Sequence, residues 1–449
     1  MSTDSALSLF STKEMDEVFS LSRQLQYMTR FEWALTSALE RHGIASKGAS
    51  DALEPFLDAA FADPPSLWEQ AHQAGNLAIP FLRALTAAVS ARDEQAARYI
   101  HFGATSQDVL DTALVLQMRD ALALIRGDLE TLDASLVKLI GAHATTVLAG
   151  RTWLQDGPPV TLGLKIAGWL AALRRHRERL QAAGSRALVL QFGGAVGTLA
   201  ALGENGPAVS QALAQKLELS EPEVPWHAHR DNLVEVAATL GLLVGTLGKI
   251  AKDISLLMQT EVAELSEPGG EGRGASSTMP HKRNPVASAI ILAAAVRVPG
   301  LVSTMMAAMV QEHERGLGGW QAEWETLPEI FRLTAAALSR SLEIAGGLEV
   351  DEGQMLANLE ATHGLVLAEA VSAALVPLVG RAQAHELLQQ ASQRAVVEKK
   401  HLRDILLEMP QTRNLLSQAE LDHLLDPHNY LGSTQIFIDR VLRGTHARR

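Results

Sequence analysis

The chain has 449 residues, 47% of them hydrophobic, and a formal net charge of −12. This length supports a large hydrophobic core and about two to four domains. The acidic balance, without a basic face or tail, argues against a protein that binds nucleic acid or an anionic membrane. The chain has no cysteine, which excludes disulfides and thiolate metal sites.

The first twenty residues, "MSTDSALSLFSTKEMDEVFS", carry four acidic side chains and no unbroken apolar core. A signal peptide needs a basic start followed by such a core. The apolar run "ASAIILAAAV" ends at Arg297, and no run approaches the roughly 18 residues that span a membrane. We therefore expect a soluble cytoplasmic protein.

Taken in chain order, the patterns predict an all-α protein. Shorter, more polar helices precede a central region in which Ala and Leu dominate and β-branched alternation is scarce. Long helices are expected there over residues 111–146, 159–183, 231–265, 285–312 and 327–347. Short helices return near the C-terminus. These segments predict an N-terminal helical domain (1–110), a central long-helix bundle (111–360) and a C-terminal helical domain (361–449).

The helix expected over 231–265 is apolar on nearly every face. Other helices must surround such a helix. A single layer of five helices does not cover every face, so this pattern favours burial between subunits. The alternative is a monomeric bundle with one fully internal helix.

Four polar stretches interrupt the Ala- and Leu-rich pattern, and we expect chemistry there. They are "HFGATSQD" (101–108), "GRTWLQDGPPVT" (150–161), the Gly-rich run 267–284, and "QEHERGLGGWQAEWETLPE" (311–329). Each has a plain structural interpretation. The hydroxyls and Asp108 cap a helix, Arg151 and Trp153 form a packed turn, the Gly-rich run is a surface loop, and His313 and Arg315 belong to a helix end.

Taken together, the four stretches favour a site for a small polyanion. Hydroxyls and N–H groups at a helix start bind carboxylates as readily as they cap the helix. Lys282 and Asn284 are donors between two prolines, which limit their freedom, and Arg151 and Arg315 offer planar forks that match a carboxylate. The sequence holds no P-loop, dinucleotide-binding glycine pattern, HExxH or EF-hand spacing. It therefore predicts chemistry on a small polycarboxylate with no cofactor and no metal.

The chain resembles the fumarase/aspartase superfamily over nearly its whole length. "SSTMPHKRNP" is similar to the signature loop of that superfamily, a highly specific match. "HFGATSQDVLDT" and "GRTWLQ" resemble its first and second regions, and "QFGGAVGT" resembles another shared stretch. Within the superfamily, "PWHAHRD", "DISLLMQTE", "AEWETLPE" and "DPHNYLG" are similar to the carboxymuconate cycloisomerase branch.

The resemblance implies an isomerase, an intramolecular lyase that closes a lactone ring on a carboxylated muconate during aromatic catabolism. It also implies a homotetramer, with each active site lined by three subunits, and a three-domain fold with a long central bundle. The reaction would pass through a carbanion stabilised as an aci-carboxylate. Two alternatives stay open: a lyase such as adenylosuccinate lyase, and a non-catalytic relative like the lens crystallins derived from this superfamily.

Departures from the superfamily pattern favour the cycloisomerase branch. Trp153 stands where the lyases have a His, and Ala289 stands where they have its partner Glu. A lyase needs such an acid to protonate a leaving amine or hydroxyl, whereas the carboxylate of a lactonising enzyme is already an anion. Ala275 replaces the usual Gly of the signature loop and stiffens it, and Asp156-Gly157 replaces the more usual His-Ala.

The resemblance also implies roles for individual residues. The signature loop closes over the substrate and excludes water, and Lys282 and Asn284 hold the carboxylate that gains charge, as an oxyanion hole does. Trp153 forms an apolar wall beside the reacting carboxylate. The proton donor to carbon stays open between Ser276, Ser277, Lys282 and His101. The expected substrate-binding residues are Thr105, Ser106, Arg151, Trp153, Gln155, His281, Asn284 and Arg315.

Overall fold

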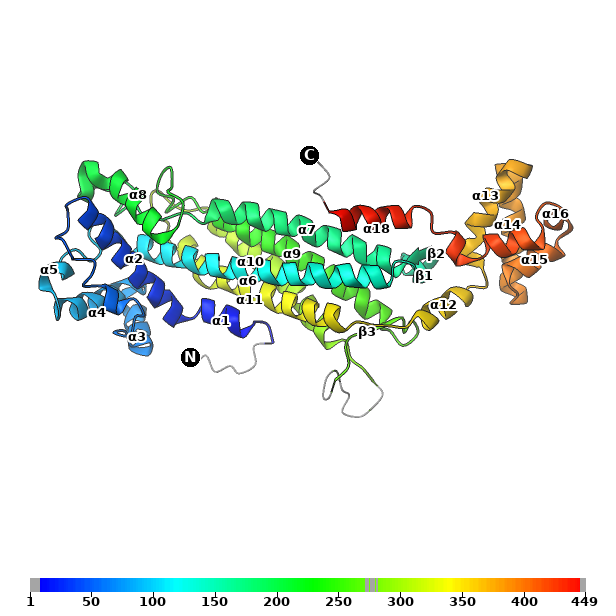
Figure 1. Ribbon diagram of the computed structural model, residues 1–449, viewed down its shortest axis with the longest axis horizontal. Helices are drawn as coiled ribbons and strands as arrows, with labels where there is room; N and C mark the ends of the chain where they lie inside the picture. Colours follow the sequence, from blue (N-terminus) through cyan, green and yellow to red (C-terminus); the bar gives the residue numbers. More distant parts are fainter. Residues whose placement is uncertain (1–8, 271–273, 275–278, 280–281, 445–449) are drawn as a thin grey trace. The chain divides into compact units, whose positions relative to one another are not determined.

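The protein is described here by a computed structural model that covers residues 9–270, 274, 279 and 282–444 (Figure 1). Within these residues it is all-α, as predicted, apart from two short antiparallel β-pairs. The candidate residues Ser276, Ser277 and His281 lie outside the described residues.

Five helices have 23 or more residues and form the bundle region that the sequence predicts. They are α6 (Ser106–Ala142), α7 (Leu162–Ala187), α9 (Asp231–Leu257), α10 (Val286–Ala308) and α11 (Gly319–Gly347). The two largest differences from the sequence prediction are eight residues each. Helix α11 begins at Gly319 and not at 327, because Pro328 lies inside the helix rather than at its start. Helix α9 ends at Leu257 and not at 265.

The remaining elements are shorter. The α-helices are α1 (Lys13–Val18), α2 (Leu21–Arg41), α3 (Pro64–Ala74), α4 (Ala78–Ser90), α5 (Glu94–Ala97), α8 (Gly206–Leu217), α12 (Glu352–Glu360), α13 (Ala368–Val379), α14 (Arg381–Glu398), α15 (Leu402–Glu408), α16 (Pro410–Arg413), α17 (Gln418–Leu424) and α18 (Thr434–Arg443). The strands are β1 (Val147–Thr152), β2 (Gln155–Thr161), β3 (Leu265–Ser266) and β4 (Glu349–Val350), paired β1 with β2 and β3 with β4.

The chain forms two compact units. The first contains Met1–Leu129, His176–Leu247 and Ile290–Ser339, and the second contains Glu130–Arg175, Gly248–Ala289 and Arg340–Arg449. Every boundary between them falls inside a long helix, so each of the five long helices contributes to both units. The three-domain division with boundaries near 110 and 360 stays a prediction.

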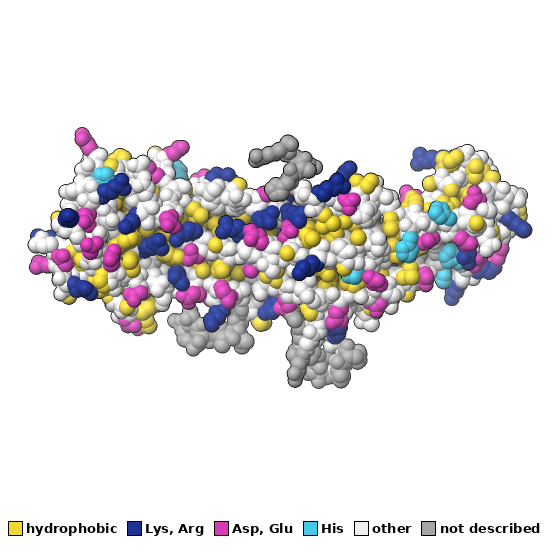
Figure 2. Space-filling view, in the orientation of Figure 1, with side chains coloured by type: hydrophobic (Ala, Val, Ile, Leu, Met, Phe, Trp, Pro, Cys, Tyr) yellow, Lys and Arg dark blue, Asp and Glu magenta, His cyan; other side chains and the backbone are white. Residues whose placement is uncertain are grey.

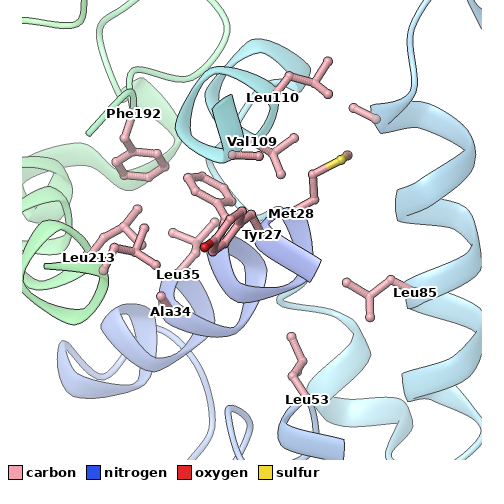
Figure 3. Close-up of a cluster of buried hydrophobic side chains, with 14 of the residues drawn as sticks. Tyr27, Met28, Ala34, Leu35, Leu53, Leu85, Val109, Leu110, Phe192 and Leu213 are labelled. Carbon is pink, nitrogen blue, oxygen red and sulfur yellow. The ribbon is translucent and has the colours of Figure 1, made fainter. Parts of the chain in front are cut away.

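The core of the first unit lies against the start of α6. Figure 3 shows Val109 and Leu110, on the first turns of α6, among Met28 and other buried side chains of this core. Phe192 and Leu213 close the same cluster from the segment after α7 and from α8. Buried apolar packing therefore fixes the helix end that carries the first predicted site residues.

Within each unit, side chains of neighbouring long helices contact one another. In the first unit, His176 on α7 lies 2.7 Å from Thr246 on α9. In the second unit, Arg174 on α7 donates to Asp133 on α6, and Trp169 on α7 donates to Asp253 on α9 at 3.0 Å. Polar contacts thus supplement apolar packing between these helices.

The expectation that no apolar run approaches membrane-spanning length was wrong: among the described residues, helices α9 and α10 are each long and apolar enough to cross a membrane by length and composition. They differ in how far the chain itself covers them. The most apolar 18-residue window of α9 is 61% buried, whereas that of α10 is 28% buried. Large apolar side chains on α10, including Val296 and Met306, are exposed. Figure 2 shows apolar side chains at the surface along the long helices.

Candidate active site

The first unit brings three predicted site residues together at the start of α6. The guanidinium of Arg315 donates to Thr105 Oγ1 at 2.7 Å and to Ser106 Oγ at 3.2 Å. Its Nε donates to Gln107 Oε1 at 3.4 Å. The Arg315 cation and two hydroxyls therefore lie together at the positive end of a long helix, an arrangement that suits a carboxylate group.

Asp108 caps the start of α6, so the two hydroxyls do not have to. Its carboxylate is fully buried and accepts the backbone N–H of Thr105 at 2.9 Å. It also accepts the N–H groups of Gly193 at 3.0 Å and Gly194 at 2.9 Å. The backbone of Thr105 begins the helix while its side chain stays with Arg315. The capping and binding interpretations of this stretch thus apply to different residues.

The "QFGGAVGT" stretch supplies the backbone that Asp108 binds. Gly194 has φ +68°, and a Cβ atom there would lie 2.8 Å from the carbonyl oxygen of Gly103. Only glycine accepts this conformation and this close approach. His227 completes the ligands of Asp108, with its Nε2 2.6 Å from Asp108 Oδ1.

A buried ionic cluster lies next to this helix start. Arg230 is fully buried and binds two carboxylates, Asp111 at 2.6 and 3.0 Å and Glu323 at 2.6, 3.0 and 3.1 Å. Burial acts to lower the pKa of Arg230, but the two carboxylates raise it above its usual value. Burial raises the pKa of Glu323, and Arg230 opposes that rise. The cation is therefore held by opposite charge on both sides.

His101, a candidate proton donor, is bound to a buried carboxylate in the same unit. Its Nδ1 lies 2.7 Å from Glu32 Oε1, and its backbone N–H donates to Glu32 Oε2 at 2.8 Å. Burial acts to lower the pKa of His101, but the charge of Glu32 and its hydrogen bond raise it above the usual value. This imidazole therefore retains its proton to a higher pH than a free histidine.

In the second unit, Arg151 belongs to the β1–β2 hairpin and its fork is already occupied. It donates to Glu264 Oε2 at 2.8 Å and to Glu264 Oε1 at 2.6 Å, and Glu264 is fully buried. Asp156, opposite Arg151 in the hairpin, lies 3.2 Å from its Nε. Within the chain, Arg151 therefore attaches the hairpin to the segment before β3.

The hairpin tip carries Trp153 and Leu154 as a two-residue turn between the paired residues Thr152 and Gln155. Both turn residues have positive φ, +53° and +63°. The Trp153 side chain is 97% exposed, and Gln155 is exposed beside it. The hairpin thus presents a large aromatic ring that the chain itself does not cover.

The signature loop is closed at its base in the second unit. Asn284 donates to the carbonyl of Gly274 twice, from its backbone N and from Nδ2, at 3.0 Å each. Arg283 binds Glu349 at 2.6 and 2.8 Å and the carbonyl of Glu267 at 2.5 Å. Lys282 is exposed, and within the described part of the chain no ion pair to it is found.

The chain is similar to known proteins over most of its length. Residues 17–300 match the family described as Lyase, and residues 364–441 match the adenylosuccinate lyase C-terminus. A 3-carboxy-cis,cis-muconate cycloisomerase from Pseudomonas aeruginosa is 54% identical, over 98% of this chain and 95% of the relative. One from Acinetobacter baylyi is 47% identical, over 97% of each chain. The crystal structure of the 3-carboxy-cis,cis-muconate lactonizing enzyme from Pseudomonas putida superposes with a TM-score of 0.93 and 52% identity, over 97% of each chain.

The chain belongs to the fumarase/aspartase superfamily. The two positions that the sequence resemblance sets apart from the superfamily lyases carry neither an acid nor a base. Trp153 lies in the hairpin turn, and Ala289 is exposed on the first turn of α10.

The sequence analysis missed several polar residues around the superfamily's first region. The buried ones are Glu32, Gln107, Asp111, His227, Arg230 and Glu323. The stretch "PWHAHRD" contains a signal that could have identified His227 and Arg230. An Arg and a His in a short break between apolar helices indicate a buried polar cluster. Nothing in the local sequence around Glu32 marks it, because it lies in the middle of α2, 69 residues before His101.

Two further observations concern metal ligands and cavities. Among the residues that the structure describes, no group of three or more His, Asp or Glu side chains is arranged to hold a metal ion. The first unit contains a cavity of about 850 Å³, lined by Trp68, His72, Trp324, Arg332 and other residues of α3, α6 and α11. Of the predicted site residues that the structure describes, none lines this cavity.

Proposed function

We propose that the protein is a cofactor-independent cycloisomerase that interconverts 3-carboxy-cis,cis-muconate and 4-carboxymuconolactone. The relatives with 54% and 47% identity carry that name. One local observation separates this activity from that of the lyases. The hairpin tip presents Trp153, an apolar ring, and α10 presents Ala289, so neither of these two positions carries the acid that a leaving amine or hydroxyl requires. The one carboxylate of the hairpin, Asp156, is paired with Arg151.

The proposed reaction needs no protonated leaving group. One carboxylate oxygen of the substrate bonds to a carbon of a double bond, and the π electrons move to the neighbouring carbon. That carbanion is delocalised into an adjacent carboxylate, and the carbon then takes a proton. In the reverse direction the ring C–O bond breaks and the leaving carboxylate departs as an anion.

Two groups of residues take separate parts in this reaction. Arg315, Thr105 and Ser106 form one binding site, because the three side chains already lie together. We assign to this site a substrate carboxylate whose charge does not change in the reaction. Lys282 and Asn284 hold the carboxylate that gains charge in the intermediate, where a fixed cation stabilises it most. Gln155 and His281 bind the remainder of the substrate, and Arg151 fixes the hairpin that carries Trp153.

The proton donor is one of four residues: Ser276, Ser277, Lys282 or His101. His101 has a specific argument in its favour, because Glu32 holds its Nδ1 and raises its pKa. An imidazolium is a far better acid than a serine hydroxyl.

We propose further that the active protein is a homotetramer whose active sites are shared between subunits. Two exposed apolar features support this: the poorly covered α10 and the Trp153 tip. Large exposed apolar surfaces of this kind mark sites of association. We place the enzyme in the cytoplasm, in protocatechuate degradation by the β-ketoadipate pathway, with a small tricarboxylate as its substrate and no nucleic acid or membrane as partner.

The test is an ultraviolet assay with two substrates in parallel, each in the presence of EDTA. Loss of diene absorbance with 3-carboxy-cis,cis-muconate alone is the expected result. Conversion of adenylosuccinate alone would establish the second candidate, a lyase, which the match of residues 364–441 to the adenylosuccinate lyase C-terminus favours. An activity that EDTA abolishes and a divalent ion restores would overturn the cofactor-independent mechanism.

A further inference from the structure

The amide of Gln107 connects the carboxylate site to the buried ionic cluster. It is buried on the first turn of α6. Its Oε1 accepts from Arg315 Nε at 3.4 Å, while its Nε2 donates to Asp111 Oδ2 at 3.1 Å and to the carbonyl of His227 at 2.9 Å. Two acceptors therefore fix the NH2 end, and this leaves the carbonyl oxygen directed at Arg315.

Asp111, the anchor of this amide, is itself held from several sides. Arg230 binds both of its oxygens, and Trp320 Nε1 donates to Oδ1 at 2.9 Å. Gln191 Nε2 lies 3.3 Å from Oδ2. A buried carboxylate with this many donors has one orientation, so the position of Gln107 follows from the cluster rather than from its own rotamer preference.

The segment that carries Arg315 is attached to the same cluster at both ends. At its start, Gln311 Nε2 donates to Glu323 Oε1 at 3.3 Å, and Glu323 is bound by Arg230. At its end, Trp320 donates to Asp111. Arg315 lies midway between these two attachments. The two halves of the carboxylate site, the α6 start and the 311–320 segment, therefore share one buried cation as their common support.

We propose that Gln107 is a positioning residue that, anchored by the Arg230 cluster, fixes the Arg315 guanidinium before substrate binds. This inference rests on the proposed function in one respect only, the assignment of Arg315 to a substrate carboxylate. A guanidinium that is already oriented loses little freedom on binding, so preorganisation contributes to affinity. Because that carboxylate keeps its charge, the effect belongs in KM and not in kcat.

The test compares two buried glutamines of α6. Gln107→Met removes the amide, and Gln117→Met is the matched control, because Gln117 is also buried but donates to the carbonyl of Val18 at 2.8 Å. We expect Gln107→Met to raise KM about tenfold, the scale of a lost hydrogen bond to a charged group, with kcat unchanged. Gln117→Met should leave both constants unchanged.

A double-mutant cycle with Arg315→Met separates positioning from a general loss of structure. If Gln107 acts through Arg315, adding Gln107→Met to Arg315→Met leaves KM where Arg315→Met alone puts it. Additive effects on KM, or a fall in kcat that equals the fall in kcat/KM, would overturn the proposal. If Gln107→Met does not fold, Gln107→Leu, which also removes the amide at a similar volume, should raise KM in the same way.

A crystal structure of Gln107→Met decides the matter without reference to any substrate. The guanidinium of Arg315 should leave Thr105 and Ser106, and an unchanged guanidinium overturns the proposal. Calorimetry with tricarballylate, a small saturated tricarboxylate, distinguishes a failure of the proposed function from a failure of the positioning role of Gln107. If the wild-type protein neither binds it nor converts 3-carboxy-cis,cis-muconate, the proposed function fails, while the position of Arg315 in the variant still tests the role of Gln107.

Discussion

Lys282 and Arg283 are neighbouring cations of the signature loop with different surroundings. Arg283 is bound by both oxygens of Glu349 and by a backbone carbonyl. Those contacts lower the pKa of Glu349, chiefly through the hydrogen bonds from Arg283. Lys282 has no such carboxylate among the described residues. The positive charge that stands out in an acidic sequence therefore includes one cation, Arg283, that is bound within the chain, while the role of Lys282 toward a ligand stays a prediction.

Replacing Lys282 should affect the chemical step. Lys282→Met should lower kcat by about 10²–10³, because the ammonium is assigned to charge that develops in the transition state. Arg315→Met should mainly raise KM, since its carboxylate does not change charge. Steady-state kinetics on both variants checks the pair. A Lys282 variant that shifts only KM, together with an Arg315 variant that loses kcat, would reverse the two roles.

The raised pKa of His101 makes a prediction about stability and pH. The folded-state pKa lies above the unfolded value of about 6.5. The stabilisation is therefore complete below about pH 6.5 and is lost as the pH rises through the folded pKa. His101 has φ +61°, a conformation that Asn tolerates. His101→Asn should flatten the decline in melting temperature above pH 6.5, and an unchanged slope would show that Glu32 does not bind an imidazolium.

At this scale the sequence indicated partly buried polar residues that the structure groups together, and it did not indicate the fully buried ones. Thr105, Ser106 and Arg315 were chosen from separate stretches, and the structure brings them together. Arg230 and Glu323 come from segments 93 residues apart, and only the folded chain shows that each is buried against the other. Local sequence reports residue type and spacing, whereas burial depends on which distant segments meet.

Among the secondary-structure elements, the start of α6 depends on one carboxylate. Asp108→Asn places an NH2 group among three backbone N–H donors, so buried donors lose an acceptor. We expect the free energy of unfolding to fall by about 1.5–3 kcal/mol. Asp93→Asn is the control, because Asp93 is an exposed N-cap and Asn caps equally well. Thermal melts should separate the two variants, and equal losses would contradict this account of Asp108.

The β1–β2 hairpin was missed because its sequence lacks the usual signals. "VLAGRTWLQDGPPVT" contains no Asn-Gly or Asp-Gly at the turn, and its strands do not alternate apolar and polar residues. The helix prediction from 159 onwards therefore overlapped the end of β2, and α7 begins at Leu162. The Arg151 guanidinium binds the buried carboxylate of Glu264 and so attaches the hairpin to the second unit, although the turn residues themselves do not favour a hairpin.

The exposed ring at the hairpin tip should matter for activity and not for folding. Trp153→Ala removes a side chain that is 97% exposed within the chain, so the secondary structure measured by circular dichroism should not change. If the ring completes a site in another copy, kcat/KM should fall about tenfold or more, as for a buried aromatic anchor. Trp68→Ala, at an exposed Trp of α3, is the control. Full activity of Trp153→Ala would remove the hairpin tip from the site.

For the molecule as a whole, the long apolar helix that the chain leaves least covered is α10 and not α9. The sequence pointed to the helix beginning at residue 231 because it has no polar face. In the structure the chain itself covers much of α9, and α10 is the helix left open. An apolar helix that the chain covers and an apolar helix that the chain leaves exposed have the same sequence pattern. The pattern gives the residue types around the helix and not the helices that pack against it.

The assembly can be tested at one exposed valine of α10. Val296 is 80% exposed in the chain, and Val397 on α14 is 81% exposed. Val296→Glu should lower the mass measured by light scattering from that of a tetramer, because an unpaired carboxylate would be buried between subunits. Val397→Glu should leave the mass unchanged. A wild-type chain that is monomeric at micromolar concentration would contradict the tetramer itself.

The turn at Trp153 and Leu154 has a consequence for engineering. Two bulky residues in the left-handed region each store on the order of 1 kcal/mol or more of backbone strain. An Asn-Gly pair would relieve that strain and suit the hairpin better. A library sorted only for heat resistance should therefore enrich variants that have discarded the aromatic tip. If Trp153 has the role in activity proposed for it, those variants also lose turnover, and thermostabilisation then needs residues 153–154 held fixed or a sort on activity after every round.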